Sequence, residues 1–351
     1  MFQISSKKFG TYYFFTYLCN QKHIINLNKP FRTMKKLLIS CGLALLTTGA
    51  FAQLGDFRIG AGVGVGTTGI DIDVSATYGN YLGARFGVDI FPSIKVKTDL
   101  DLKLEEQNKK ISTMTNEINQ LNATLPPSQR VDLSRYPGGN LPDKIDVEGK
   151  WTNTTWHLLF DVYPFGAASS FHATVGAYFA PKKIVKVYNT QDGYLQPLVA
   201  YNNAIAYAQN HPVSAQRAVV DQYNLKMIGA ELGEYFITPD PDDGGNVEAN
   251  IEVGGFRPYL GIGFGRAVPK GRIGFQFDLG VMFWGTPEIY APSAIKNADG
   301  TFQTEPNGNL KVERTKLSKE SVEGDGGDVI KTISKITVYP VLNFRLTGRI
   351  L

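Results

Sequence analysis

The sequence predicts an all-β protein, an eight-stranded antiparallel up-and-down transmembrane β-barrel with long, partly helical extracellular loops. Three features predict it: eight stretches that alternate apolar and polar residues, alternating short and long connections, and an export signal. In the last stretch, Leu342, Phe344 and Leu346 alternate with Asn343 and Arg345. Because successive side chains of a strand point to opposite sides, this period of two gives the sheet one apolar face.

The export signal occupies residues 34–52. Met34-Lys35-Lys36 begins a positively charged region, an apolar core follows, and Ala50-Phe51-Ala52 supplies a small-x-small cleavage site after Ala52. This is the pattern of a secretory signal peptide, and its apolar core is shorter than the ~20 residues of a transmembrane helix. We interpret residues 1–33 as a leader before a mis-set start codon, with a longer targeting sequence as the alternative. Lipid attachment at Cys41 is a weaker alternative, because the apolar run continues beyond it.

Removal of the signal changes the charge of the chain. Residues 1–52 hold seven of the 36 Lys and Arg and none of the 32 acids, which leaves 29 basic and 32 acidic residues and a net charge of −3. The net charge of the mature chain therefore does not suggest that it binds nucleic acid. Cys19 and Cys41 both lie in the removed part, so we expect no disulfide, thiolate metal site or cysteine nucleophile in the mature residues 53–351.

The mature part divides into eight predicted strands and their connections. Tight turns alternate with three long loops, at about 98–150, 189–249 and 286–333, as in outer-membrane barrels with short periplasmic turns and long extracellular loops. Periodicity predicts helices at 100–125 and 204–227 in the first two loops. Ten strands remain the alternative if 184–199 and 234–253 form another hairpin. The predicted strands are 56–66, 69–78, 81–97, 151–163, 170–188, 250–265, 272–285 and 334–351.

The polar face of these strands indicates the inside of a narrow barrel. It carries glycine interleaved with arginine, aspartate and histidine, whereas the polar face of a soluble sheet usually carries lysine and glutamate. An eight-stranded barrel has a lumen that side chains just fill, and guanidinium groups pair well with carboxylates there. The opposite face is apolar and suits lipid. We predict a closed lumen with a polar network of Arg58, Asp71, Asp73, Arg85, Asp89, His157, Asp161, His172, Arg257, Asp278, Arg345 and Arg349.

Aromatic residues near the predicted strand ends fit the two membrane interfaces, where aromatic girdles occur. This predicted girdle consists of Tyr78, Trp156, Phe171, Phe256, Phe283 and Trp284.

Several segments resemble those of small OmpA/OmpX/OmpW-type outer-membrane barrels, particularly those of Bacteroides-like bacteria. Residues 256–265 (FRPYLGIGFG) resemble a strand frequent in that superfamily, and 161–165 with 170–172 resemble one of its hairpins. The final strand resembles the C-terminal signal read by the barrel-assembly machinery, although Leu351 replaces the usual aromatic residue. The resemblance covers the strands, not the loops. It implies a bacterial outer-membrane location without the OmpA-type periplasmic domain.

Other motifs have simpler interpretations. Residues 64–69 match GxGxxG, but a predicted strand follows where dinucleotide binding requires a helix. A metal site at His157, Asp161 and His172 is conceivable, but we interpret them as part of the polar network and predict no metal or cofactor. Asp71 and Asp73 are expected to pair with Arg58 and Arg85. The acidic run at 240–245 lacks EF-hand spacing and is interpreted as a solvated turn.

These features favour a non-enzymatic outer-membrane protein with no catalytic residues, acting structurally or through its loops on an unidentified extracellular ligand. Its expected partners are outer-membrane lipid and the barrel-assembly machinery, not nucleic acid. The alternative is a narrow porin-like channel, which eight strands argue against because water-filled channels need about 16.

Overall fold

The computed structural model describes residues 56–131, 133, 141–318, 320–322 and 325–351. The predicted leader, signal peptide and cleavage site lie outside the described residues. Within them, no helix is both long and apolar enough to cross a membrane.

Eight strands form a closed antiparallel barrel in the spatial order β1-β16-β13-β12-β7-β6-β3-β2. Each strand pairs with the previous and next barrel strand of the chain, and β16 pairs with β1 to close the ring. The predicted eight-stranded up-and-down barrel is confirmed. Its strands are β1 (Phe57–Gly66), β2 (Gly69–Tyr78), β3 (Leu82–Ile90), β6 (Thr155–Val162), β7 (Phe171–Phe179), β12 (Phe256–Gly265), β13 (Ile273–Phe283) and β16 (Val338–Arg349).

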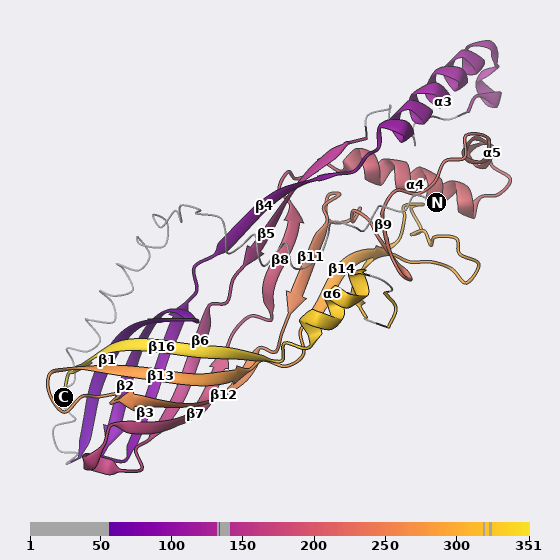
Figure 1. The fold of residues 1–351 in the computed structure, drawn as a ribbon. Coiled ribbons are helices and arrows are strands. Elements are labelled where there is room, and N and C mark those ends of the chain that lie inside the picture. The colour runs from indigo at the N-terminus through magenta and orange to yellow at the C-terminus, as the bar shows by residue number, and fades with distance from the viewer. Residues whose placement is uncertain (1–55, 132, 134–140, 319, 323–324) are drawn as a thin grey trace.

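A second antiparallel sheet extends from one end of the barrel (Figure 1). Five of its strands are continuations of β3, β6, β7, β12 and β13 beyond breaks of three or four residues. Three of the predicted strands, 81–97, 170–188 and 250–265, therefore ran across two sheets. The predicted long loops also contain strands that sequence reasoning missed. The strands of this second sheet are β4 (Ile94–Asp101), β5 (Lys144–Trp151), β8 (Lys183–Asn189), β9 (Ala230–Leu232), β10 (Tyr235–Ile237), β11 (Glu248–Glu252), β14 (Glu288–Ala294) and β15 (Val312–Leu317).

Proline accounts for three of the breaks between the sheets. Pro92 separates β3 from β4, Pro181 separates β7 from β8, and Pro287 separates β13 from β14. A proline has no backbone N–H to donate and is disfavoured inside a paired sheet, so the ladder is interrupted at these three positions. The segments that suggested ten strands, 184–199 and 234–253, contribute β8, β10 and β11 to the second sheet instead.

Helices form the far end of the molecule (Figure 1). Here α3 (Glu105–Thr124) packs on α4 (Gln196–Asn210) and α5 (Ala215–Gln222) through buried Ile111, Met114 and Ile205. The helix predicted at 100–125 is present, but it begins five residues later, because Leu100 and Asp101 end β4. The helix predicted at 204–227 is present with its interruption near Pro212, but it begins eight residues earlier. A short 3-10 turn, η3 (Pro127–Gln129), follows α3, and η4 (Gly166–Ala168) lies between β6 and β7.

The third predicted loop is also structured. It contains β14, β15 and α6 (Asp325–Ser334), which lies beside the second sheet (Figure 1). Ile330 of α6 is buried with Ala291 and Leu317 of that sheet. Sheet, α6 and the helical tip thus form one extension of the barrel strands.

Candidate functional site: the barrel lumen

The outer surface of the barrel is apolar along its length. Large apolar side chains from every barrel strand are exposed, among them Val65, Phe86, Phe160, Leu260 and Phe275. Phe275 is 79% exposed. Soluble monomers rarely expose apolar patches of more than a few hundred Å², whereas a membrane barrel needs such a band around its wall.

The inner surface is polar and buried. Arg345 is fully buried in the lumen, where its Nε lies 3.1 Å from Asp71 Oδ2 and its Nη2 pairs with Asp73 Oδ2. Its Nη1 donates to the side-chain oxygen of Gln276, and Asn343 Nδ2 donates to Asp71 Oδ2 at 2.8 Å. One guanidinium therefore joins β2, β13 and β16 across the barrel.

Two glycines of β1 make room for Arg345. A Cβ atom at Gly64 would lie 2.6 Å from Arg345 Cγ, and one at Gly62 would collide with the guanidinium itself. Real Cβ atoms do not approach other atoms that closely. The alternation of glycine with long polar side chains is thus a packing arrangement, as the sequence predicts.

A second guanidinium group, that of Arg85, lies nearer the end of the barrel with the short turns. Its Nη2 is 2.7 Å from Asp161 Oδ1, and its Nη1 is 2.8 Å from Asp278 Oδ2. Thr174 donates to Asp161, and His172 Nε2 lies 2.8 Å from Asp278 Oδ1. Five side chains from β3, β6, β7 and β13 therefore form a single buried cluster.

Gln276 connects the two clusters, a role that sequence reasoning missed. Its oxygen accepts from Arg345, and its nitrogen lies 3.2 Å from His172 Nε2. Its inward position on β13 was evident from the alternation, but the pattern gave no sign that a neutral amide bridges two ionic groups.

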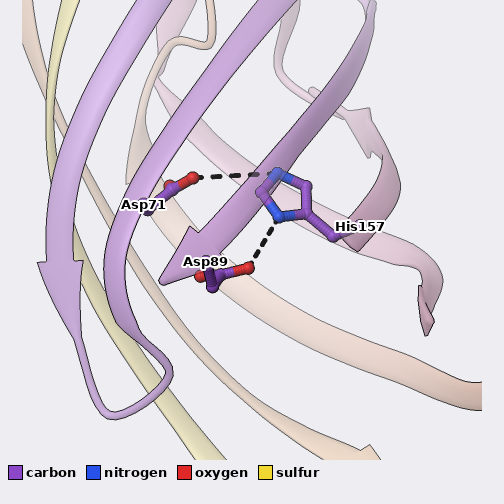
Figure 2. Close-up of side chains that lie close together, drawn as sticks. All are labelled: Asp71, Asp89 and His157. Atoms are coloured by element: carbon purple, nitrogen blue, oxygen red, sulfur yellow. Dashed lines mark hydrogen bonds and ion pairs between the residues drawn. The ribbon is translucent and has the colours of Figure 1, made fainter. Parts of the chain in front are cut away.

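The third group of the lumen contains His157, Asp71 and Asp89, near the second sheet. Figure 2 shows a carboxylate facing each nitrogen of the His157 ring. Asp89 Oδ2 lies 2.8 Å from Nδ1, and Asp71 Oδ1 lies 3.9 Å from Nε2. Asp89 also accepts from Thr68 at 2.6 Å and from Thr155 at 3.2 Å.

An apolar layer inside the lumen lies beside this third group. Leu159, Tyr178, Tyr259, Met282 and Val341 are all buried and pack together. The alternation suggested a wholly polar interior, so this layer was missed. The signal was present, because each of these side chains occupies an inward position of its strand. The lumen is therefore filled partly by charge pairs and partly by apolar packing.

The turn between β12 and β13 fills the other end of the lumen. Ala267 and Val268 are fully buried, and Ala267 N donates to the Tyr163 hydroxyl at 2.9 Å. Arg266 donates to the carbonyls of Gly166 and of Ser169. Sequence reasoning missed Arg266 because a turn residue has no place in a strand alternation.

Three of the predicted lumen arginines lie outside the ionic network. Arg58 donates to Gly79 O and Asn80 Oδ1 at the rim, and Arg349 is exposed. Arg257 is buried but donates to Gly254 O, Asn153 Oδ1 and Pro181 O where the barrel meets the second sheet.

The predicted partners of the aspartate pair also need correction. Both Asp71 and Asp73 pair with Arg345, not with Arg58 or Arg85. Alternation gives the face of a residue but not its height in the barrel, so it could not assign these pairs. The other nine predicted residues lie in the three connected groups. Asp161 and His172 belong to the group around Arg85, apart from His157.

The predicted aromatic girdle is only partly on the outer surface. Tyr78, Trp156, Phe256 and Phe283 are exposed near strand ends, and Phe171 is half-buried beside Phe264. Trp284 is wrong as a girdle residue, because it is buried between barrel and second sheet. Its Nε1 donates to Ile336 O at 2.6 Å, and its ring lies against Tyr339.

One face of the second sheet carries a ladder of charges. Glu148 lies 2.8 Å from Lys95 and accepts from the Tyr188 hydroxyl, and Arg314 pairs with Glu252 at 2.6 Å. Burial alone raises the pKa of the Glu148 carboxyl, but the hydrogen bonds from Lys95 and Tyr188 outweigh it and hold the pKa below its usual value. This extension therefore has the mixed charged surface of a water-exposed sheet.

The GxGxxG match at 64–69 and the acidic run at 240–245 both have structural roles. Residues 64–69 form the β1–β2 hairpin, where Gly69 takes a φ of +113°. In the acidic run, Asp242 N donates to Asp240 Oδ1 and Gly245 N donates to Asp240 O, as in a turn.

Known proteins give distant structural likenesses to this chain, three of which are described here. No family model matches the chain, and no curated protein matches it. Its structure is similar to those of CarO and CarO2 from Acinetobacter baumannii, with 14% and 15% identity and TM-scores of 0.35 and 0.36. Each comparison covers 83% of this chain and 97% or 98% of the other.

The third is a major outer membrane protein from Thermus thermophilus. It is 13% identical, with a TM-score of 0.30, over 84% of this chain and 98% of the other. Scores this low do not define a common fold, so the barrel assignment rests on the strand pairing of this chain.

Proposed function

We propose that this chain is a non-enzymatic bacterial outer-membrane barrel that anchors an extracellular sheet and helical tip, with a closed lumen. The observation that carries this proposal is the inverted polarity of the barrel. Its outer wall exposes Phe275, Leu260 and Val65, whereas charged Arg345 and Arg85 are buried in the lumen. Lipid is the solvent that suits this arrangement, because a closed barrel satisfies its own backbone hydrogen bonds.

The extension supports a role at the cell surface. Its strands continue those of the barrel, and its tip is held by a separate core around Ile111, Met114 and Ile205. A structure whose only task was to span the membrane would not need this second core. We also propose that the chain is related to OmpA/OmpX/OmpW-type barrels and that the barrel-assembly machinery recognises its C-terminal strand.

The orientation of the tip is directly testable. Val213, between α4 and α5, is 99% exposed. An epitope inserted after Val213 is expected to bind antibody on intact cells, because the short turns face the periplasm in such barrels. A matched epitope in the short turn after Gly79 should bind only after the outer membrane is permeabilised. Labelling with the reverse pattern would contradict the proposed orientation.

The alternative of a narrow channel is tested by conductance. The ionic groups, the apolar layer and the turn at Ala267 together fill the lumen, so the chain should show no steady current in planar bilayers. Arg85→Ala should also remain silent, because the apolar layer and the turn stay in place. Steady wild-type current that changes with Arg85→Ala or Asp89→Ala would support the channel.

A further inference from the structure

Two of the three lumen groups contain the same residue types but differ in how completely they are paired. Each combines two aspartates with one histidine whose ligand atoms lie within 4.8 Å of one another: Asp71, Asp89 and His157 in one, and Asp161, His172 and Asp278 in the other. Both are buried. The difference between them lies in the cations nearby.

In the group around His172, Arg85 already bridges the two carboxylates at 2.7 and 2.8 Å. His172 Nε2 is 2.8 Å from Asp278 Oδ1, and its Nδ1 is 3.3 Å from the Ser170 carbonyl. Each ring nitrogen of His172 therefore has a partner, and the two carboxylates share one guanidinium. One oxygen of Asp161 accepts no hydrogen bond from the described residues, and without the imidazole this group has one negative charge in excess.

The group around His157 has the larger excess of negative charge. Among the described residues, Asp71, Asp73 and Asp89 face a single guanidinium, that of Arg345. With a neutral imidazole this leaves two negative charges, and His157 as a cation would leave one. Unpaired charge is very costly away from water. A further positive charge, from protons or from a metal ion, is therefore required here.

The atoms around His157 indicate where that charge lies. Asp71 is 1% exposed, and its Oδ1 has no hydrogen-bond partner among the described residues. It faces His157 Nε2 at 3.9 Å, too long for a hydrogen bond. If Nε2 carries a proton, that proton has no partner. If it carries a lone pair, the lone pair faces a carboxylate oxygen.

A metal ion between the two atoms satisfies both. We propose that Asp71 Oδ1 and His157 Nε2 bind a first-row divalent metal ion such as Zn²⁺, with Asp89 as the group that orients the imidazole. Two ligands of a tetrahedral zinc ion lie about 3.4 Å apart, so a small rotation of the Asp71 carboxylate completes the site. Imidazole with carboxylate suits Zn²⁺ and its neighbours better than Ca²⁺ or Mg²⁺.

The role of Asp89 follows from its hydrogen bonds. It accepts from His157 Nδ1, Thr68 and Thr155, so both of its oxygens are already engaged. A carboxylate on Nδ1 fixes the tautomer that presents the Nε2 lone pair to a metal, the usual arrangement of a metal-binding histidine. A divalent ion then cancels the two remaining negative charges and ties β2 to β6 inside the barrel.

The test is metal loading of the purified protein in detergent. The chain is refolded with Zn²⁺, passed through gel filtration, and its metal content is measured. Wild type should retain about one zinc per chain. Asp71→Asn and His157→Gln should lose it, and Asp89→Asn should bind zinc about 10- to 100-fold more weakly.

Two matched controls distinguish this site from others. His172→Gln alters the group around Arg85 and His211→Gln removes an exposed imidazole, so both should retain the zinc. Folding of each variant is checked by its heat-dependent migration. If His157→Gln does not fold, Cu²⁺ bound to wild type should still show nitrogen hyperfine coupling in its EPR spectrum.

Three results would overturn the proposal. Wild type refolded with zinc could retain none, which would mean that protons alone supply the charge. Zinc could persist in folded His157→Gln, or be lost only in His211→Gln, which would show a surface site. Absence of nitrogen coupling in the Cu²⁺ spectrum would exclude His157 as a ligand.

Discussion

Replacing Arg345 with methionine is expected to destabilise the barrel by about 3–5 kcal/mol, because it leaves buried carboxylates without their partner. Arg345 contacts both Asp71 and Asp73 and lies between strands that close the ring. Methionine keeps most of the side-chain volume, so the loss of stability measures the effect of removing the guanidinium charge. The measurement is urea unfolding in detergent or lipid vesicles, followed by the loss of heat-modifiable migration.

The control for Arg345 lies on the same strand. Arg349 is exposed, and its side chain donates to the Lys270 carbonyl at 3.3 Å, so Arg349→Met should change stability by less than about 0.5 kcal/mol. Arg345→Lys should fall between, because it keeps the charge but loses the planar fork. Equal stability of Arg345→Met and Arg349→Met would show that the buried pairs do not hold the barrel closed.

Replacing Leu260 with arginine is expected to cost about 2–4 kcal/mol in lipid, the penalty for a cation near the bilayer midplane. Leu260 is 57% exposed, in the middle of β12, beside Val175 and Val281 on the neighbouring strands. In water, an arginine at such an exposed position would be nearly neutral. The same urea unfolding in vesicles measures the difference.

Position along the strand supplies the control for Leu260. Phe256→Arg, at the end of β12, should cost about 0–1 kcal/mol, since the penalty declines toward the interface. Val213→Arg, at the tip, should have no effect on barrel stability. Similar small effects at Leu260 and Phe256 would argue that the outer wall does not face lipid.

The barrel was predictable because its strands obey one simple rule. Inward and outward residues alternate within each of β1, β2 and β3, and glycine marks inward positions near the arginines. Turn residues at Gly79 and Thr67 then fix the hairpins. Alternation therefore gave strand number, face and order.

The second sheet was missed for the same reason that the barrel was found. Alternation continues beyond the barrel, and only Pro92, Pro181 and Pro287 mark where one sheet ends.

The ion pairs were missed because residues such as Asp71 and Arg345 lie 274 positions apart in sequence. Their heights in the barrel depend on how the ring closes. Predicting the bridging role of Gln276 and the apolar layer would also require the heights of these residues in the barrel.

We propose that lipid solvates the outer wall of the barrel while charged side chains fill the inside. The most direct measurement is the state of the purified chain after dilution from urea into buffer with and without lipid vesicles. We expect a heat-modifiable, protease-resistant barrel that floats with the vesicles, and aggregation without them. A folded, monodisperse chain in lipid-free and detergent-free buffer would contradict it.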